Sequence, residues 1–211
     1  RLDMPAPAFE IDGKRTVLSV ASFHETSVSE VIPGVFEYVM EGELVVNHKL
    51  SLRLVIRLSE NTPFVRFRYI VIGEGRLTRS SGKDMMSYLS IDMKDAKEVR
   101  EVRLSDFDEL VHSYLPNEET VSGKAFDDGM SLMGPILCAS GPENSWLCAY
   151  EHGSQPPFRF LEYALHADCK AELVAVRGNC WHGRDLRKGH DTPWFDIGIV
   201  EIGRASCRER V

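Results

Sequence analysis

The sequence predicts an all-β fold, a large antiparallel β-sandwich, and three observations support this prediction. In residues 44–72 apolar and polar side chains alternate with period two and not with the helical 3.6. Sixteen Gly and ten Pro are spread along the chain, which suits many turns between strands. About ten short segments resemble strands, and no helical pattern exceeds a turn or two.

Residues 44–72 are expected to form a long antiparallel hairpin. The even-numbered residues of 44–58 are apolar apart from His48, and we expect those of 50–58 to face a second sheet, with Arg53 facing water. His48 itself is expected to be a core histidine. The polar segment 59–63 supplies the turn, and apolar residues then alternate with arginines up to residue 72.

The rest of the chain is expected to form shorter strands, two pairs of which are hairpins around the turn segments 140–145 and 166–170. Residues 73–87 and 178–192 are expected to be loops, and 104–116 fits either a helical turn or a loop with a strand. The other expected strands span 16–20, 35–40, 88–93, 99–104, 133–139, 146–150, 158–165, 171–176 and 193–200.

Composition argues against two classes of partner. The formal net charge of -7 disfavours nucleic acid, which is bound by clustered Lys and Arg. No apolar run approaches the roughly 20 residues of a membrane span. A neutral ligand fits better, and we expect no cofactor.

Cysteine usage bears on the compartment. Cys138 and Cys148 flank the expected hairpin around 140–145, where they would be able to pair, but we favour free thiols and therefore a cytoplasmic location. The chain opens at Arg1 without an initiator Met, so the sequence leaves a signal peptide open.

We expect two segments of different origin. Residues 1–200 form one domain, which we expect to be incomplete at both ends. Residues 201–211, EIGRASCRERV, match the translation of a common sequencing adapter, so we treat them as a non-native tail.

Two clusters of polar residues have simpler explanations than chemistry. Asp127 and Asp128 are adjacent, but neighbours in an extended chain point to opposite faces, so we expect a surface turn before Gly129. A second set has the composition of a metal site, yet its spacing fits no zinc pattern, and we expect no metal. This set is Cys180, His182, His190 and Asp191.

Four segments occur in the order MGPIL, WLCAYEHGSQPP, VRGNCWHG and TPWFDIG, after EVREVRLSDFDELVHSYLP. Together they resemble the N-terminal domain of alpha-galactosidases of glycoside hydrolase family 36 over roughly residues 98–200. Residues 150–155 match the family's Y-E-H-G-[SA]-Q segment completely. Arg177, the pair Cys180-Trp181 and residues 156–158 depart from the family pattern.

The resemblance implies a supersandwich of the galactose-mutarotase-like type, the non-catalytic part of a glycoside hydrolase. In the family this domain precedes a (β/α)8 barrel, whose two Asp perform retaining hydrolysis of terminal alpha-linked galactose. One Asp lies in a K-W-D segment, which this sequence lacks. The implied partners are an alpha-galactoside oligosaccharide and the barrel of the same chain, and a homo-oligomer stays open.

Within this fragment the resemblance implies no catalytic residue. Tyr150, His152 and Trp181 are the candidates for sugar contact, although for His152 we favour a role in fixing its loop, and Trp181 would equally pack beneath the barrel. Phe158, Trp181 and Trp194 are the aromatics expected nearest the barrel. Two alternatives remain, a free-standing carbohydrate-binding β-sandwich and the N-terminal domain of a glycoside phosphorylase.

Overall fold

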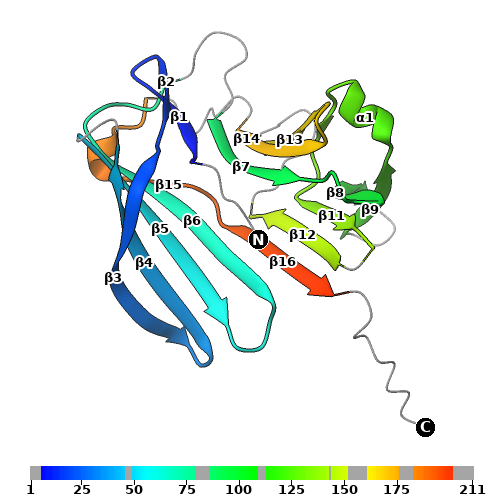
Figure 1. The fold of residues 1–211 in the computed structure, drawn as a ribbon, viewed down its shortest axis with the longest axis horizontal. Coiled ribbons are helices and arrows are strands. Elements are labelled where there is room, and N and C mark those ends of the chain that lie inside the picture. The colour runs from blue at the N-terminus through cyan, green and yellow to red at the C-terminus, as the bar shows by residue number, and fades with distance from the viewer. Residues whose placement is uncertain are drawn as a thin grey trace.

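The computed structural model describes residues 6–45, 49–78, 86–108, 113–142, 144–151, 161–175 and 183–201. Within these residues the strands form a ten-stranded sheet, a four-stranded sheet and a separate hairpin, all antiparallel (Figure 1). The all-β sandwich predicted from the sequence is confirmed. Among the described residues no helix is long and apolar enough to cross a membrane.

In spatial order the large sheet holds β3 (Val20–Ile32), β4 (Val35–Leu44), β5 (Leu50–Ser59), β6 (Phe64–Gly73), β16 (Phe195–Glu201), β12 (Asn144–Tyr150), β11 (Ile136–Ser140), β8 (Glu98–Asp108) and β9 (Ser113–Val121). Strand β15 (His190–Asp191) also pairs with β6. The small sheet holds β10 (Ser131–Leu132), β13 (Leu161–His166), β14 (Lys170–Ala175) and β7 (Met86–Asp92). The remaining elements are β1 (Ala8–Ile11), β2 (Lys14–Val17), α1 (Gly123–Asp127) and the 3₁₀ helix η1 (Leu186–Lys188).

The core lies between the two sheets and is rich in aromatic rings. The ring centroid of Tyr88 on β7 lies 5.4 Å from that of Phe195 on β16, and Tyr150 on β12 lies 5.7 Å from Tyr163 on β13. All four residues are buried. Because aromatic side chains bury large apolar areas, these contacts across the sandwich are a main source of its cohesion.

The expected hairpin is formed by β5 and β6, whose register pairs Leu54 with Tyr69 and Leu52 with Val71. These four residues are buried, and we call the face of the large sheet that they share the inner face. The opposite, outer face carries Arg53, which forms an ion pair with Glu41.

Two parts of the hairpin prediction are wrong. The expected strand through residues 44–58 is broken, because β4 ends at Leu44 and β5 begins at Leu50; both residues are buried, so the period-two pattern continues across the connection. Leu58, expected to be covered, is 40% exposed. His48 lies outside the described residues.

Strands β3, β4, β5 and β6, which we call the arm, extend to one side of the small sheet (Figure 1). Apolar residues on the inner face of the arm therefore lose their cover toward its end. Val28 is 44% exposed, Leu58 40% and Val65 37%, although Leu58 and Val65 are cross-strand partners in the same face. The inner face of the arm is thus an open apolar surface in the described structure.

Strand β3 is the outermost strand of the arm, and sequence reasoning missed most of it because its pattern is mixed. Its register against β4 shifts at three places, and each shift leaves one unpaired residue: Ala21, Thr26 and Val31. These shifts are β-bulges, which strengthen the local twist. They let thirteen residues of β3 run beside the ten residues of β4.

The hairpins expected around 140–145 and 166–170 are confirmed as β11–β12 and β13–β14. Residues 104–116 continue β8 and open β9 on either side of 109–112, which lie outside the described residues. The expected surface turn before Gly129 is present at Asp128, whereas Asp127 is the last residue of α1 and not part of an extended chain. Residues 186–188 and 190–191, expected to be loop, form η1 and β15 instead.

Cys138 and Cys148 are free thiols. Their strands place them on opposite faces, because Cys148 pairs with Leu137 and Cys138 pairs with Leu147. Burial raises the pKa of the Cys148 thiol to about 12. The register therefore rules out the disulfide between them.

Candidate functional site

Three arginines and one tryptophan cluster on the outer face of the large sheet. The guanidinium carbons of Arg57, Arg66 and Arg68 lie 4.4, 5.4 and 4.6 Å from the ring centroid of Trp194. We call this group the arginine–tryptophan cluster. Contacts of this kind place a cation against the electron-rich face of an indole ring.

Strand register brings the arginines together. Arg57 and Arg66 are direct cross-strand partners on β5 and β6, and Arg68 lies two residues farther along the same face. The row through Arg57 and Arg66 continues to Glu37 on β4 at one end and Asp196 on β16 at the other. Four neighbouring strands thus present two carboxylates flanking two guanidinium groups in one line.

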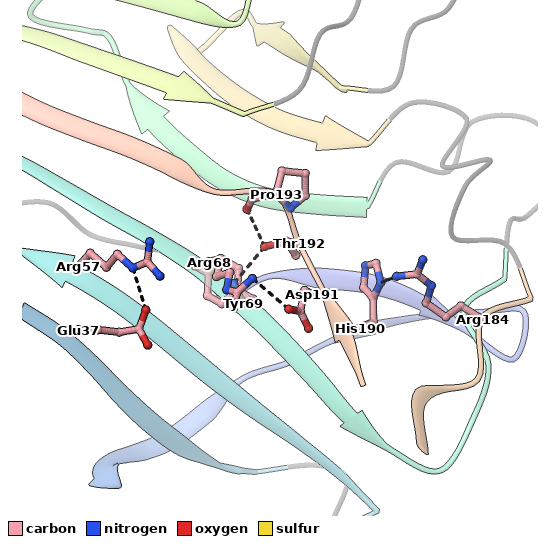
Figure 2. Close-up of polar contacts among 9 residues, drawn as sticks. All are labelled: Glu37, Arg57, Arg68, Tyr69, Arg184, His190, Asp191, Thr192 and Pro193. Atoms are coloured by element: carbon pink, nitrogen blue, oxygen red, sulfur yellow. Dashed lines mark hydrogen bonds and ion pairs between the residues drawn. The ribbon is translucent and has the colours of Figure 1, made fainter. Parts of the chain in front are cut away.

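Trp194 owes its position to an interruption in the strand beside β6. Asp191 pairs with Ile70 and Phe195 pairs with Phe67, so the three residues 192–194 stand opposite only two residues of β6. Thr192 anchors this bulge: the Tyr69 amide donates to Thr192 Oγ1 at 3.0 Å, and the Thr192 amide donates to the Tyr69 carbonyl at 2.9 Å (Figure 2). The extra residue leaves Trp194 half-buried over the arginines.

Each arginine of the cluster is paired with a carboxylate. Arg57 Nε donates to Glu37 Oε2 at 2.7 Å, and Arg68 Nη1 lies 3.0 Å from Asp191 Oδ2 (Figure 2). Arg66 forms an ion pair with Glu151 and lies 4.0 Å from Asp196. The cluster therefore has three cations and four carboxylates, so it is close to neutral and slightly acidic.

Asp196 is the carboxylate of the cluster whose ionisation is perturbed. Burial raises the pKa of Asp196, while Arg66 lowers it and Glu151 raises it further. Glu151 is exposed, and its backbone amide donates to the Trp194 carbonyl at 2.9 Å. The ends of β12 and β16 are thus locked together beside the cluster.

The structure places the expected site residues in different surroundings. Tyr150 is 4% exposed, and its hydroxyl donates toward the Met133 carbonyl at 2.9 Å, so it lies in the core. His152, Phe158 and Trp181 lie outside the described residues. Trp194, expected near the barrel, is a member of the cluster.

The set with the composition of a metal site is only partly visible. His190 is fully buried, and its Nδ1 lies 3.2 Å from Arg184 Nη1 (Figure 2). Asp191 is exposed and pairs with Arg68. Cys180 and His182 lie outside the described residues, and within the described part no group of three or more metal-ligating side chains occurs.

Sequence reasoning placed Arg66 and Arg68 on the polar face of the hairpin but did not assemble the cluster. The signal was the TPW segment, since Pro193 has no amide for a ladder and so marks the interruption that carries Trp194.

No family model matches this chain, and no curated protein sequence matches it either. Solved structures share its fold. GH36 alpha-galactosidases AgaA and AgaB from Geobacillus stearothermophilus superpose with a TM-score of 0.54 at 9% and 10% identity. Alpha-N-acetylgalactosaminidase NagBb from Bifidobacterium bifidum, as a quadruple mutant, gives 0.51 at 8% identity.

Each of these matches covers 93% of this chain and 30% of the other. At such low identity the likeness is one of fold. The chain therefore has the fold of a domain found in these glycoside hydrolases, and it spans about a third of their length.

Proposed function

We propose that this chain is the N-terminal, non-catalytic domain of an alpha-galactosidase that removes terminal alpha-linked galactose by a retaining two-Asp mechanism. The fold shared with GH36 enzymes over 93% of the chain carries the proposal. The four sequence segments that resemble that family, in the same order, support it independently.

The meeting of two of these segments adds support. Tyr150, which opens the Y-E-H-G-S-Q segment, pairs directly with Phe195 of the TPWFDIG segment. Glu151 and Trp194 are joined by the backbone hydrogen bond beside the arginine–tryptophan cluster. Segments more than forty residues apart therefore form one corner of the domain.

The role proposed for the domain is support of a catalytic barrel in the same chain. A retaining mechanism requires two carboxyl groups about 5 Å apart, one of them a free nucleophile. The carboxylates of the cluster are instead engaged by arginines. The open inner face of the arm is the kind of surface that a neighbouring domain covers.

The first test is the coding sequence that follows Val200 in the parent gene. A (β/α)8 barrel containing a K-W-D segment would support the proposal. A helical toroid would instead assign the domain to a glycoside phosphorylase, and a stop codon would assign it to a free-standing carbohydrate-binding sandwich.

The second test is activity. The 211-residue chain should not hydrolyse an aryl alpha-galactoside, because both carboxylates of the mechanism are proposed to lie in the barrel. The parent enzyme, assayed in parallel, should release the aryl alcohol. Turnover by the chain alone that survives repurification would contradict the proposed division of labour.

A further inference from the structure

A groove of about 540 Å³ runs from the arginine–tryptophan cluster on the outer face of the large sheet to the end of the arm, where Ile32, Val35 and Leu58 also line it. Arg57, Arg66 and Asp196 lie along it, and hydroxyl side chains come from Ser59 at the end of β5 and Thr62 in the turn that follows. Its volume falls within the range of roughly 300–1,000 Å³ that is typical of small-molecule sites. No residue of the groove was singled out as a binding residue from the sequence.

The polar lining of the groove suits a ligand rich in hydroxyl groups. A guanidinium group offers several donors in a fixed plane, and a carboxylate offers only acceptors. Arg57 and Asp196 therefore supply both kinds of partner that a sugar hydroxyl, itself a donor and an acceptor, needs. The hydrogen bond from Arg57 to Glu37 and the strand register hold these groups in place without a ligand.

The apolar lining is equally suited to a sugar ring. A Cβ atom added to Gly198 would lie 2.3 Å from the ring of Phe64, so this ring packs directly on the glycine backbone. Phe64 is thereby fixed in the wall of the groove beside Leu147 and Ala149. Such surfaces fit the C–H face of a pyranose.

The charge balance selects against ionic ligands. Arg57 is neutralised by Glu37, and Arg66 is paired with Glu151 and lies near Asp196. An anion such as a phosphate would meet the carboxylate of Asp196 in the groove, beside two guanidinium groups whose charge is already offset by Glu37 and Glu151. We propose that the groove binds a neutral oligosaccharide through Arg57, Arg66, Asp196 and the wall formed by Phe64.

The choice of sugar rests on the proposed function, which makes alpha-galactosides the first probes. Melibiose and raffinose would be titrated into the 211-residue chain by calorimetry, with cellobiose as a neutral control and glucose 6-phosphate as a charged one. The alpha-galactosides should bind, and the phosphate ester should not.

Three variants test whether the sugar binds in the groove. Arg57→Ala should weaken binding by about tenfold or more, because a charge-assisted partner is lost. Ala149→Met should weaken it by narrowing the groove while leaving the polar groups intact. Arg53→Ala is the matched control, since Arg53 lies on the same strand and face, pairs with Glu41 and does not line the groove. Thermal unfolding would verify that each variant is folded.

The outcomes separate this inference from the proposed function. Binding of cellobiose that depends on Arg57 and Ala149 would keep the groove as a saccharide site and contradict the galactoside assignment. The groove is overturned if no neutral sugar binds, if folded Arg57→Ala and Ala149→Met variants bind as well as the unchanged chain, or if glucose 6-phosphate binds more tightly.

Discussion

Glu101 is a buried carboxylate that holds a distant segment in place. It is 4% exposed, and its Oε1 accepts hydrogen bonds from the amides of Met133 and Gly134 at 2.8 and 2.6 Å. Gly134 tolerates no side chain here, because a Cβ atom would lie 2.4 Å from the Val102 carbonyl oxygen. One side chain thus fixes the approach to β11.

Glu101→Ala should lower the free energy of unfolding by about 1–3 kcal/mol, because two buried amides lose their acceptor. Denaturant titration would measure the change. Glu119→Ala is the control. Glu101 Oε2 lies 3.5 Å from Arg103 Nε, and Glu119 pairs with the same arginine but is half exposed, so removal of the Glu119 carboxylate should cost no more than about 1 kcal/mol. Equal losses in the two variants would contradict the role given to Glu101.

His190 is the second buried group with a measurable consequence. Burial, and then the nearby Arg184, lower the pKa of His190 from 6.5 to about 4. The unfolded chain therefore binds a proton between pH 6.5 and pH 4 that the folded chain does not, so stability is present above pH 6.5 and is lost as the pH falls through this window.

From pH 7 to pH 5, the lowered pKa of His190 should reduce the free energy of unfolding by about 2 kcal/mol. Carboxyl groups also begin to bind protons as the pH approaches 5, and this changes the free energy of unfolding as well. The His190→Gln variant therefore serves as the reference. Its stability should fall less steeply from pH 7 to pH 5 than that of the unchanged chain. Parallel slopes would show that His190 does not resist protonation in the fold.

For single residues, the sequence predicts which face of a strand a side chain takes but not which distant side chain it meets. Alternation placed Leu54 on the inner face and Arg53 on the outer face, because the face that a residue takes depends on the local strand alone. Trp194 beside Arg57 depends on which strands become neighbours and on one extra residue opposite β6. The strand order that brings Trp194 and Arg57 together cannot be read from the local pattern of a single sequence.

At the scale of elements, the hairpin of β5 and β6 shows how far a period-two pattern reaches. The pattern gives the correct face for Leu50, Leu52 and Leu54. It does not reveal the break before Leu50, because Leu44, the last residue of β4, has the same parity as Leu50 and is also buried. Nor does it reveal where the cover ends, since Leu58 has the right parity but lies beyond the small sheet.

Substitutions along β5 test this register. Leu54→Asp should unfold or aggregate the protein, because it buries an unpaired charge, whereas Arg53→Asp should stay folded. Leu58→Asp should also be tolerated, because residue 58 is 40% exposed. Melting temperatures of the three variants would check the order, and equal melting of Leu54→Asp and Arg53→Asp would refute the register.

At the scale of the whole molecule, the two sheets differ in extent. Ten strands face four within the described residues, and the arm carries the excess. The sequence predicted a second sheet because the hairpin needed a covered face, and this is confirmed. The unequal extent was not predictable, because it depends on which of the short strands join which sheet.

The 211-residue chain alone should self-associate, because the inner face of the arm exposes apolar residues. Sedimentation and the fluorescence of anilinonaphthalene sulfonate would measure this. The double variant Val28→Thr with Leu58→Ser should reduce both signals, since it makes this face more polar. A monomer that binds no dye would instead favour the free-standing carbohydrate-binding sandwich.

The three bulges of β3 have a further consequence for the arm. A regular edge strand offers its free backbone groups to any other chain in the same extended form, and stacked repeats of such pairing are the basis of amyloid fibrils. The unpaired residues Ala21, Thr26 and Val31 recur every fifth position and interrupt that regularity along the whole edge. We therefore expect the bulges of β3 to hinder edge-to-edge pairing with another chain, and we expect a chain that lacks these three residues to present a regular edge.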